Sequence, residues 1–345
     1  MADKTLNIDY SSLAPTTEIR IFTLQQGISN DPIVCILRSV TRTEAEYYAL
    51  SYEWGDESKN DPFITVNDRT VQVRANLLDA LKSIRKPTED LQLWVDAICI
   101  NQSDLKEKSQ QVAMMGETFK NAVGIISWLG PTKDDSDLAM DLMSDADDLE
   151  SKLSSFSKSS RESQALFSLC HRRYWLRVWI IQELYLAKSY VVWCGARSIA
   201  SDMFEESLAV LNGANSPFYH YRGFEQNPAQ EHRLARRLRN NPNDKLNTLW
   251  RWLLVCLRNG FQCTKEQDFI YALLDISDDY ERMKETLKVD YSKSPRDVFL
   301  DLLRQMDLMW HHGYRDGRHW LKLAEKMKLN IDEDLRTEIS SRFPG

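Results

Sequence analysis

The sequence predicts an α/β protein built on a parallel sheet with helices on both faces. Three observations support this prediction. Predicted strands and helices alternate between residues 91 and 129, the strands there are almost wholly apolar, and no run of about 18 apolar residues suggests a membrane span. A strand that is apolar on both faces is typically buried on both, as in the parallel sheets of α/β folds. The 345 residues suffice for two modest domains.

The chain opens with strands rather than helices. Apolar alternation or continuous apolar runs predict strands at Glu18–Leu24, Ile33–Val40, Tyr47–Tyr52, Phe63–Val66 and Thr70–Val73. The last two strands flank Asn67-Asp68, a pair typical of a tight hairpin turn. We therefore expect N-terminal antiparallel strands added to the parallel sheet.

The alternating part of the fold follows. A helix is predicted over Asn76–Ile84, with Asn76 as its cap, and the next strand is Leu91–Val95. A second helix over Asp104–Ala122 leads to a strand over Val123–Leu129. Parallel pairing is expected because each helix carries the chain back across the sheet before the next strand begins.

Helices and one more strand complete the expected fold. An exposed, acidic amphipathic helix is predicted over Lys133–Glu150, and the serine-rich segment Ser151–Ser163 is predicted to be a mobile loop. Helices at Ala165–Leu169 and Trp175–Ala187 lead to a last strand, Tyr190–Cys194. Further helices are expected near 201–212, 228–240, 244–259, 266–276, 295–309 and 315–328. We predict an α/β domain over residues 1–212 and a helical extension over 213–345 packed on it.

Composition and missing motifs exclude several classes of function. The net charge of −7 makes nucleic acid an unexpected partner. One basic cluster stands out, Arg233, Arg236, Arg237 and Arg239. We expect it to be a solvated face or a dock for the acidic segment 134–150; alternatively, it binds phosphate or an acidic partner. No two glycines stand two apart, no glycine precedes lysine, and no H-E-x-x-H occurs. Dinucleotide-loop dehydrogenases, Walker A proteins and zincin proteases are therefore excluded. The six cysteines stand singly, so we expect reduced thiols, no metal site and a cytoplasmic location.

Several segments of the chain carry distinctive motifs: Tyr48–Asp56 (YALSYEWGD), Asn76–Leu81 (NLLDAL), Leu93–Gln102 (LWVDAICINQ), Ile126–Gly130 (ISWLG) and Arg177–Leu184 (RVWIIQEL). Together these motifs resemble one fungal family, the heterokaryon-incompatibility (HET) domain. Downstream, Asp268–Leu274 (DFIYALL) resembles a D-x-x-Y-A-L-L run usually seen after that domain. The resemblance implies fungal origin and a role in non-self recognition or regulated cell death.

The HET domain is in turn similar to the Toll/interleukin-1 receptor (TIR) domain, whose fold is a flavodoxin-like parallel sheet. The segments that resemble its first three strands are Ala49–Tyr52, Trp94–Asp96 and Ile125–Ser127. Trp179–Ala187 (WIIQELYLA) resembles the TIR pattern W-C-x-x-E-L-x-x-A, with Ile180 in place of the cysteine. The glutamate of that pattern, here Glu183, cleaves NAD in TIR enzymes. The resemblance thus implies a flavodoxin-like (TIR-like) α/β fold with Glu183 as the catalytic residue.

Cleavage of NAD between nicotinamide and ribose needs few catalytic groups. The base leaves neutral from a cationic pyridinium, so no general acid is required, and one carboxylate can stabilise the oxocarbenium-like sugar. Trp179 lies one helical turn before Glu183, so we expect both in one cleft. Residues that follow parallel strands emerge at the carboxyl edge of the sheet, where ligands usually bind. The predicted substrate-binding residues are Ser51, Tyr52, Trp54, Asp96 and Trp179.

Each candidate also has a purely structural interpretation. Glu183 would face water or pair with Arg177 or Lys188, and the two tryptophans would pack in a core or an interface. Asp96 would cap the turn before Asn101, and Ser51 would be a hydrogen-bonding strand end. At a partly exposed position, replacing Glu183 by glutamine would cost under about 1 kcal/mol of stability.

Two functions compete on this basis. In the first, the chain is an effector that hydrolyses NAD to nicotinamide and an ADP-ribose product upon self-association, with NAD as substrate and no cofactor. In the second, it is a non-enzymatic module that triggers cell death by homotypic clustering. A sensor that binds a nucleotide without hydrolysing it is a third reading. The first two expect a homo-oligomer on activation and a triggering protein whose identity the sequence does not give.

Overall fold

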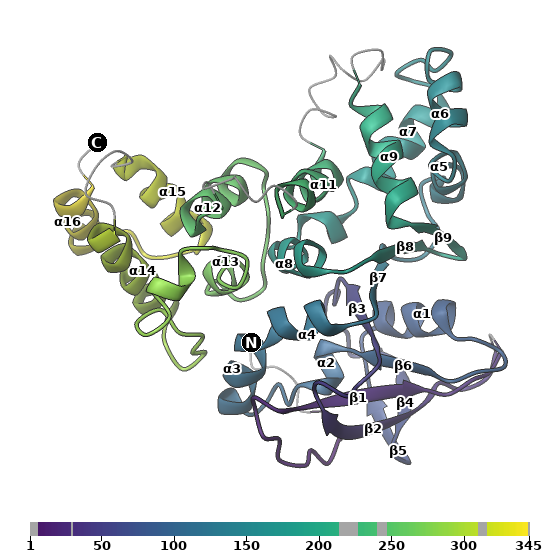
Figure 1. Ribbon diagram of the computed structural model, residues 1–345, viewed down its shortest axis with the longest axis horizontal. Helices are drawn as coiled ribbons and strands as arrows, with labels where there is room; N and C mark the ends of the chain where they lie inside the picture. Colours follow the sequence, from purple (N-terminus) through teal and green to yellow (C-terminus); the bar gives the residue numbers. More distant parts are fainter. Residues whose placement is uncertain (1–5, 29, 214–226, 240–246, 310–315, 344–345) are drawn as a thin grey trace.

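The computed structural model describes residues 6–28, 30–213, 227–239, 247–309 and 316–343. Its strands are β1 (Glu18–Leu24), β2 (Val34–Thr41), β3 (Tyr48–Tyr52), β4 (Phe63–Val66), β5 (Arg69–Gln72), β6 (Leu91–Trp94), β7 (Gly124–Trp128), β8 (Tyr190–Cys194) and β9 (Arg197–Ala200). They form one sheet in the order β5-β4-β2-β1-β6-β3-β7-β8-β9. This sheet runs through the lower right of Figure 1.

Four parallel strands form the centre of the sheet. β3 pairs in parallel with both β6 and β7, and β7 pairs in parallel with β8. Across the sheet these strands lie in the order β6-β3-β7-β8, so the second of them along the chain is followed by the first, the third and the fourth. Helices separate consecutive members in the sequence, as parallel pairing requires. The predicted α/β class is confirmed.

The N-terminal strands are mostly antiparallel, as expected. β1 lies antiparallel to both β2 and β6, and β4 lies antiparallel to β5. The β4–β5 turn has φ of 47° at Asn67 and 61° at Asp68, the left-handed backbone that a two-residue hairpin of this twist needs. The pairing of β2 with β4 is parallel, however, so the added strands are not purely antiparallel.

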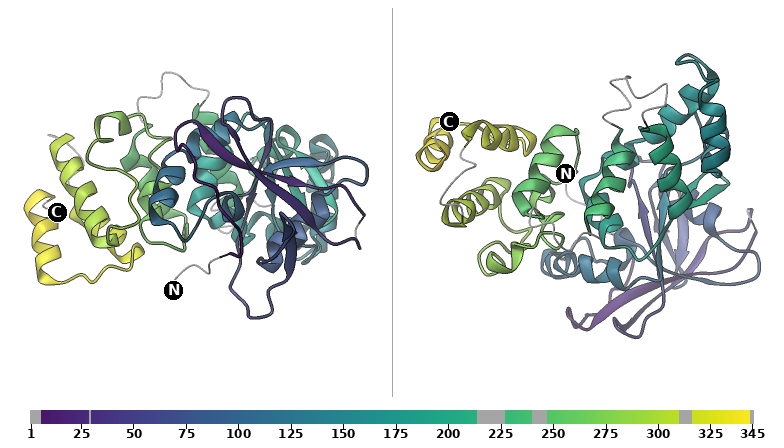
Figure 2. Two further views of the ribbon diagram at one scale, coloured as in Figure 1. Left: turned by 90° about the horizontal axis from the view of Figure 1, so that it is seen from below. Right: turned by 45° about the horizontal axis from the view of Figure 1, so that its top comes forward.

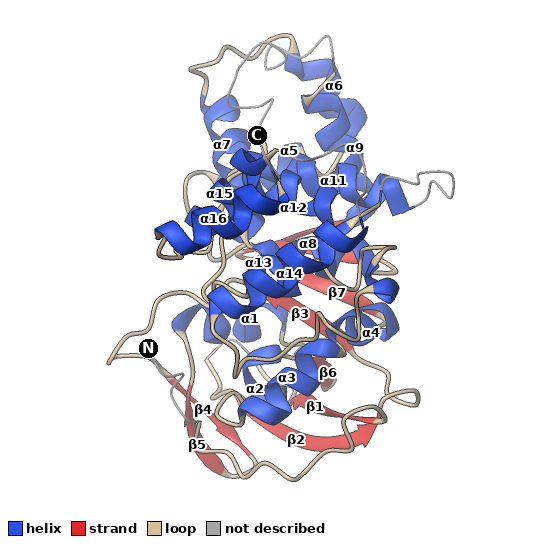
Figure 3. Ribbon diagram, turned by 90° about the vertical axis from the view of Figure 1, so that its left-hand side faces the viewer, coloured by secondary structure: helices blue, strands red, loops and turns tan. Residues whose placement is uncertain are grey.

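The helices are α1 (Ala75–Ile84), α2 (Asp96–Cys99), α3 (Leu105–Ala113), α4 (Met115–Asn121), α5 (Ser136–Leu142), α6 (Ala146–Leu153), α7 (Arg161–Cys170), α8 (Val178–Leu186), α9 (Ser201–Leu211), α11 (Pro228–Arg239), α12 (Leu249–Arg258), α13 (Asp268–Tyr271), α14 (Pro295–Met309), α15 (Gly317–Lys326) and α16 (Glu333–Arg342). The last helices gather on one side of the molecule, away from the strands (Figures 1 and 2). Figure 3, viewed from that side, shows β3 and β7 near α13 and α14, with β1, β2, β4 and β5 below them. Within the described ranges, no helix has the length and apolar character needed to cross a membrane.

Several predicted boundaries are wrong. The helix expected over 104–122 is divided at Met114 into α3 and α4, and the helix expected over 133–150 is divided into α5 and α6. The serine-rich loop is shorter than expected, because α6 extends into it and α7 begins before its end. β9 and α16 were not expected. The predicted helix boundaries at 240, 244 and 315 lie outside the described residues.

Asn76 does not cap α1. The residue at the cap position is Arg74, and no side chain accepts a hydrogen bond there. The amide of Asn76 instead donates to the carbonyl of Glu53 at 2.6 Å and accepts a hydrogen bond from Nε1 of Trp128 at 2.9 Å. It therefore ties the loop after β3 to the end of β7, next to the edge of the sheet where a ligand is expected.

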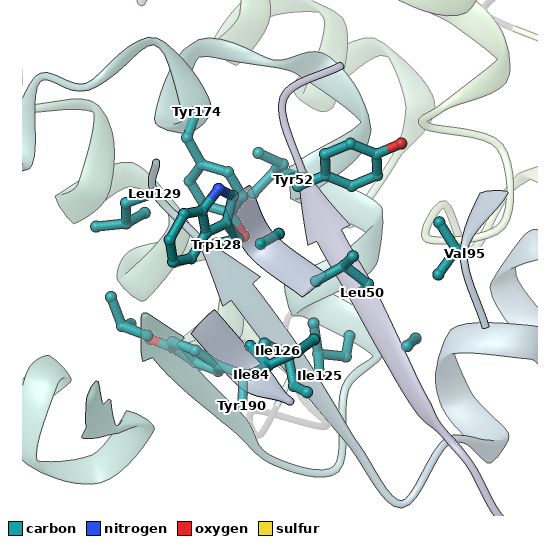
Figure 4. Packing of buried hydrophobic residues seen from close by; sticks show 14 of the residues in the cluster. Leu50, Tyr52, Ile84, Val95, Ile125, Ile126, Trp128, Leu129, Tyr174 and Tyr190 are labelled. Atoms are coloured by element: carbon teal, nitrogen blue, oxygen red, sulfur yellow. The ribbon is translucent and has the colours of Figure 1, made fainter. Parts of the chain in front are cut away.

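Helix α8 belongs to two hydrophobic cores at once. One core surrounds the sheet and includes Ile180 and Leu184, and Figure 4 shows its packing around Leu50, Ile126 and Trp128. A second core lies among α12–α16 and includes Val178 and Ile181 of the same helix. A helix that is apolar on all sides is stable only when it is covered on all sides. The C-terminal helices therefore pack directly on the element that carries Glu183.

Two arginines of the basic cluster on α11 cap the C-terminal end of α8. Arg236 donates to the carbonyls of Leu184 and Ala187, and Arg239 donates to the carbonyls of Tyr185 and Ala187. Arginines at a helix C-terminus satisfy unpaired carbonyls and interact favourably with the helix dipole. Arg233 is buried and Arg236 half-buried, which corrects the expectation of a solvated face for these two residues, whereas Arg237 and Arg239 are exposed as a solvated face requires.

Gly195 follows β8 in a backbone conformation that disfavours a side chain. Its φ is +56°, and a Cβ atom there would lie 2.0 Å from Oγ1 of Thr132. We expect Gly195→Ala to lower the free energy of unfolding by about 3 kcal/mol, since left-handed strain of about 1–2 kcal/mol adds to the clash. Gly260 has φ of +72° with nothing within 4 Å of such a Cβ, so Gly260→Ala should show the strain alone. If urea denaturation showed that the two variants lose the same free energy of unfolding, the predicted clash at Gly195 would be contradicted.

Candidate functional site

A cleft of about 210 Å³ opens at the carboxyl ends of β3 and β6. The loop after β3 contributes Trp54 to its wall, and the turn after β6 contributes Asp96. Trp179, at the start of α8, lines it as well. The segment from Gln262 to Asp268 completes the wall from the side of the C-terminal helices. The cleft therefore lies where the α/β part and the helical part meet.

Asp96 is held in a fixed orientation by neighbouring donors. Nε1 of Trp54 lies 3.1 Å from Oδ1 and 3.0 Å from Oδ2, and the backbone N–H of Ala97 donates to Oδ1 at 2.7 Å. Burial raises the pKa of Asp96, although the nearby Arg177 guanidinium partly offsets this effect. Asp96 thus makes a structural contact at the turn and still presents part of its surface to the cleft.

Glu183 is buried and is not part of the cleft wall. It is 3% exposed, is not among the residues that line the cleft, and its Oε2 has no hydrogen-bond partner within the described chain. Burial raises its pKa to about 7, and Arg177 and the hydroxyl of Ser51 only partly counter this effect. A rise of about 6 Å separates residues four apart on a helix. Since the cleft meets α8 at its first turn, Trp179 reaches the wall and Glu183 does not.

Ser51 and Tyr52 do not line the cleft either. The hydroxyl of Ser51 is 2.8 Å from the hydroxyl of Tyr174, and both side chains are buried. Tyr52 packs in the core around the sheet, as Figure 4 shows, and its carbonyl accepts a hydrogen bond from Arg177. The expectation that all six candidates share one cleft is corrected in this respect. Trp54, Asp96 and Trp179 meet in the cleft, whereas Ser51, Tyr52 and Glu183 are buried and do not line it.

The buried carboxyl group of Glu183 predicts a pH-dependent stability. Its pKa of about 7 in the folded state exceeds the ordinary value of 4.5, so the folded state binds the proton more tightly. The stabilisation from this group is complete below about pH 4.5 and is lost as the pH rises through about 7. Glu183→Gln does not titrate. The stability of this variant relative to the wild type should therefore rise by about 3 kcal/mol between pH 4.5 and pH 8.

Chemical denaturation of both proteins across this pH range measures the difference. Glu206→Gln, at an exposed position on α9, is the matched control and should show no such trend. A pH-independent difference for Glu183→Gln would contradict the prediction. The earlier expectation of a cost under about 1 kcal/mol assumed a partly exposed side chain, and the structure corrects that assumption.

The sequence did not single out other residues of the cleft as ligand contacts. Arg177 appeared only as an ion-pair partner for Glu183, yet it lines the cleft. Lys108 has no motif of its own; its Nζ lies 5.0 Å from the ring centre of Tyr291, and both side chains line the cleft. Asp268 was visible only as the first residue of the D-x-x-Y-A-L-L run. Its position in the cleft depends on how distant segments pack.

Comparison with known proteins identifies one family. The model of the heterokaryon incompatibility protein (HET) family matches residues 47–183. Heterokaryon incompatibility protein 6, OR allele, of Neurospora crassa is 34% identical over 153 residues, which cover 39% of this chain. The match covers 22% of that relative, so the chain spans about a fifth of its length. No solved structure matches.

Proposed function

Because residues 47–183 of this chain form a fungal heterokaryon-incompatibility (HET) domain, we propose that it acts in non-self recognition and regulated cell death. We further propose that it does so by hydrolysing NAD. The observation that carries this proposal is the cleft in which Trp54, Trp179, Asp96 and Arg177 meet at the carboxyl edge of parallel strands. Ligands of open α/β sheets bind at this edge.

The strand order supports the TIR-like part of the proposal. Counted along the chain, the four parallel strands lie in the order second, first, third, fourth, as in flavodoxin-like sheets. We propose that this part, within residues 1–212, is a flavodoxin-like domain and that residues 213–345 form the helical extension. Resemblance of Trp179–Ala187 to the TIR motif assigns the carboxylate chemistry to Glu183.

The residues of the site divide the work as follows. Trp54 and Trp179 offer aromatic surfaces to a base, and Arg177 offers positive charge to phosphate. The bond between C1′ of the ribose and the pyridinium nitrogen breaks, and its electron pair neutralises the ring. Water then adds to C1′ and loses a proton, which gives ADP-ribose. A carboxylate stabilises the positive charge on the sugar in between.

The position of Glu183 implies that this conformation is a resting one. Glu183 is buried and does not line the cleft, so a sugar bound in the cleft does not contact it. We propose that self-association shifts α8, or the helices packed on it, and brings Glu183 to the ribose. Because α8 contacts both hydrophobic cores, a change in the packing of the C-terminal helices acts on it directly.

Release of nicotinamide from NAD tests the proposal. The purified chain should release little nicotinamide as a monomer and release it readily once assembled, for example on fusion to an oligomerising tag. The second candidate, a non-enzymatic assembly module, is favoured by the burial of Glu183 outside the cleft wall. Cell death without nicotinamide release in any assembled state would support the module and reject the enzyme.

A further inference from the structure

The matched domain does not build the cleft alone. Asp268 lies well beyond residue 183, in the helical part of the chain, yet its side chain lines the same cleft as Asp96. Asp268 is also the first residue of the D-x-x-Y-A-L-L run. That run therefore contributes a carboxylate to the cleft in addition to its apolar packing.

The segment that carries Asp268 is fixed against the α/β part. The backbone N–H of Gln262 donates to the carbonyl of Leu176 at 2.7 Å, and the N–H of Val178 donates to the carbonyl of Gln262 at 2.9 Å. The N–H of Tyr291 donates to Oγ of Ser109 at 3.1 Å. These bonds join the side of the cleft that the helical part supplies to the α/β part.

Asp268 is itself oriented by aromatic donors, as Asp96 is. The hydroxyl of Tyr291 donates to its Oδ1 at 2.6 Å, and Trp179 hydrogen-bonds the same carboxyl group. The side chain is only 6% exposed, and burial raises its pKa. A buried carboxyl group is costly, so its position in a cleft wall needs a reason.

The charges around the two carboxyl groups indicate the class of ligand. Arg177 and Lys108 each lower the pKa of both Asp96 and Asp268, so both cations lie within electrostatic reach of both aspartates. Carboxylates accept hydrogen bonds from sugar hydroxyls, cations bind phosphate oxygens, and tryptophan rings stack on bases. A ribonucleotide presents all three kinds of group.

We infer that Asp268 is a ligand-binding residue of the cleft, and that a ribonucleotide is held jointly by the HET domain and the C-terminal helices. This inference rests on the proposed function for the identity of the nucleotide, NAD or its product ADP-ribose. It extends the site to a residue that lies outside the matched domain. The competing explanation is that Asp268 only ties the two parts of the chain together.

Binding of ADP-ribose to the full chain, measured by isothermal titration calorimetry, tests the inference without any turnover. Asp268→Asn should weaken binding by at least about tenfold, the effect of losing a charged hydrogen-bond acceptor. The matched control is Asp275→Asn. Asp275 also joins the two parts, through the N–H of Gly116 at 3.1 Å and Nε2 of Gln182 at 3.0 Å, but it is exposed and does not line the cleft.

A second variant keeps the inference testable if Asp268→Asn does not fold. Thr264 is exposed and lines the cleft from the helical side, so Thr264→Trp should fill the cleft and block ADP-ribose without altering the thermal melting temperature. Wild-type affinity in folded Asp268→Asn and in Thr264→Trp, equal losses in Asp268→Asn and Asp275→Asn, or no binding by the wild type would each overturn the inference. ADP-ribose binding that depends on Asp268 without nicotinamide release from NAD would support it and reject the proposed hydrolysis.

Discussion

Replacing Glu183 by glutamine is expected to reduce nicotinamide release by the assembled protein at least about 100-fold in kcat. The amide is nearly the same size as the carboxyl group but carries no negative charge, so it does not stabilise a positively charged sugar. Its effect on KM should be small, because Glu183 is not part of the cleft wall that first receives the nucleotide. Nicotinamide production from NAD, followed over time at saturating substrate, measures the change.

Asp96→Asn is the matched control for that experiment. Asp96 is one of the carboxylates that line the cleft within the matched domain, and it accepts hydrogen bonds from Trp54 and Ala97. Its replacement should raise KM more than it lowers kcat, since it acts on the bound ligand before the reaction. Full turnover in Glu183→Gln together with its loss in Asp96→Asn would transfer the catalytic role to Asp96.

Replacing Arg20 by alanine is expected to lower the free energy of unfolding by about 3–5 kcal/mol. Arg20 is only 2% exposed, and it binds Glu107 through two hydrogen bonds of 2.6 and 2.9 Å. It also donates to the carbonyl of Cys99 at 3.0 Å. Its loss leaves a carboxylate and a carbonyl without a cation in a poorly solvated region. Guanidinium denaturation at constant pH gives the difference.

The same change should reach the cleft. Oε1 of Glu107 accepts the backbone N–H of Asn101 at 2.8 Å, so the ion pair fixes the turn that follows Asp96. Lys86→Ala is the comparison, because the pair that Lys86 makes with Glu89 is exposed and should contribute under about 0.5 kcal/mol. If Arg20→Ala were as mild as Lys86→Ala, the buried pair would not be an organising contact.

Much of the fold could be predicted because its strands are encoded locally. β1, β4 and β8 have the predicted bounds, and the turn at Asn67 and Asp68 forms as expected. Elements that lack a local signal were missed. β9 has one buried residue in four, and α16 buries only Leu335 and Ile339, so neither shows a clear apolar period.

The interruption between α3 and α4 shows a different limit. The apolar spacing across Met114 is helical, but the N–H of Gly116 donates to Oδ2 of Asp275, which belongs to the helical part of the chain. A helical hydrogen bond at that N–H is replaced by a tertiary one. No pattern within residues 104–122 records this contact, because its partner is 159 residues away.

The sequence by itself thus determined the local secondary structure and the residue types that could bind a ligand. The spacing of apolar residues sets which segments become strands or helices, and the motifs around Trp54, Asp96 and Trp179 mark the edge of the sheet where the cleft lies. The tertiary structure alone decided that Glu183 is buried outside the cleft wall and that Asp268 lines the cleft. The physical reason is that helix periodicity fixes only which side chains of a helix share a face. Whether that face is buried depends on which segment, distant in the sequence, packs against it.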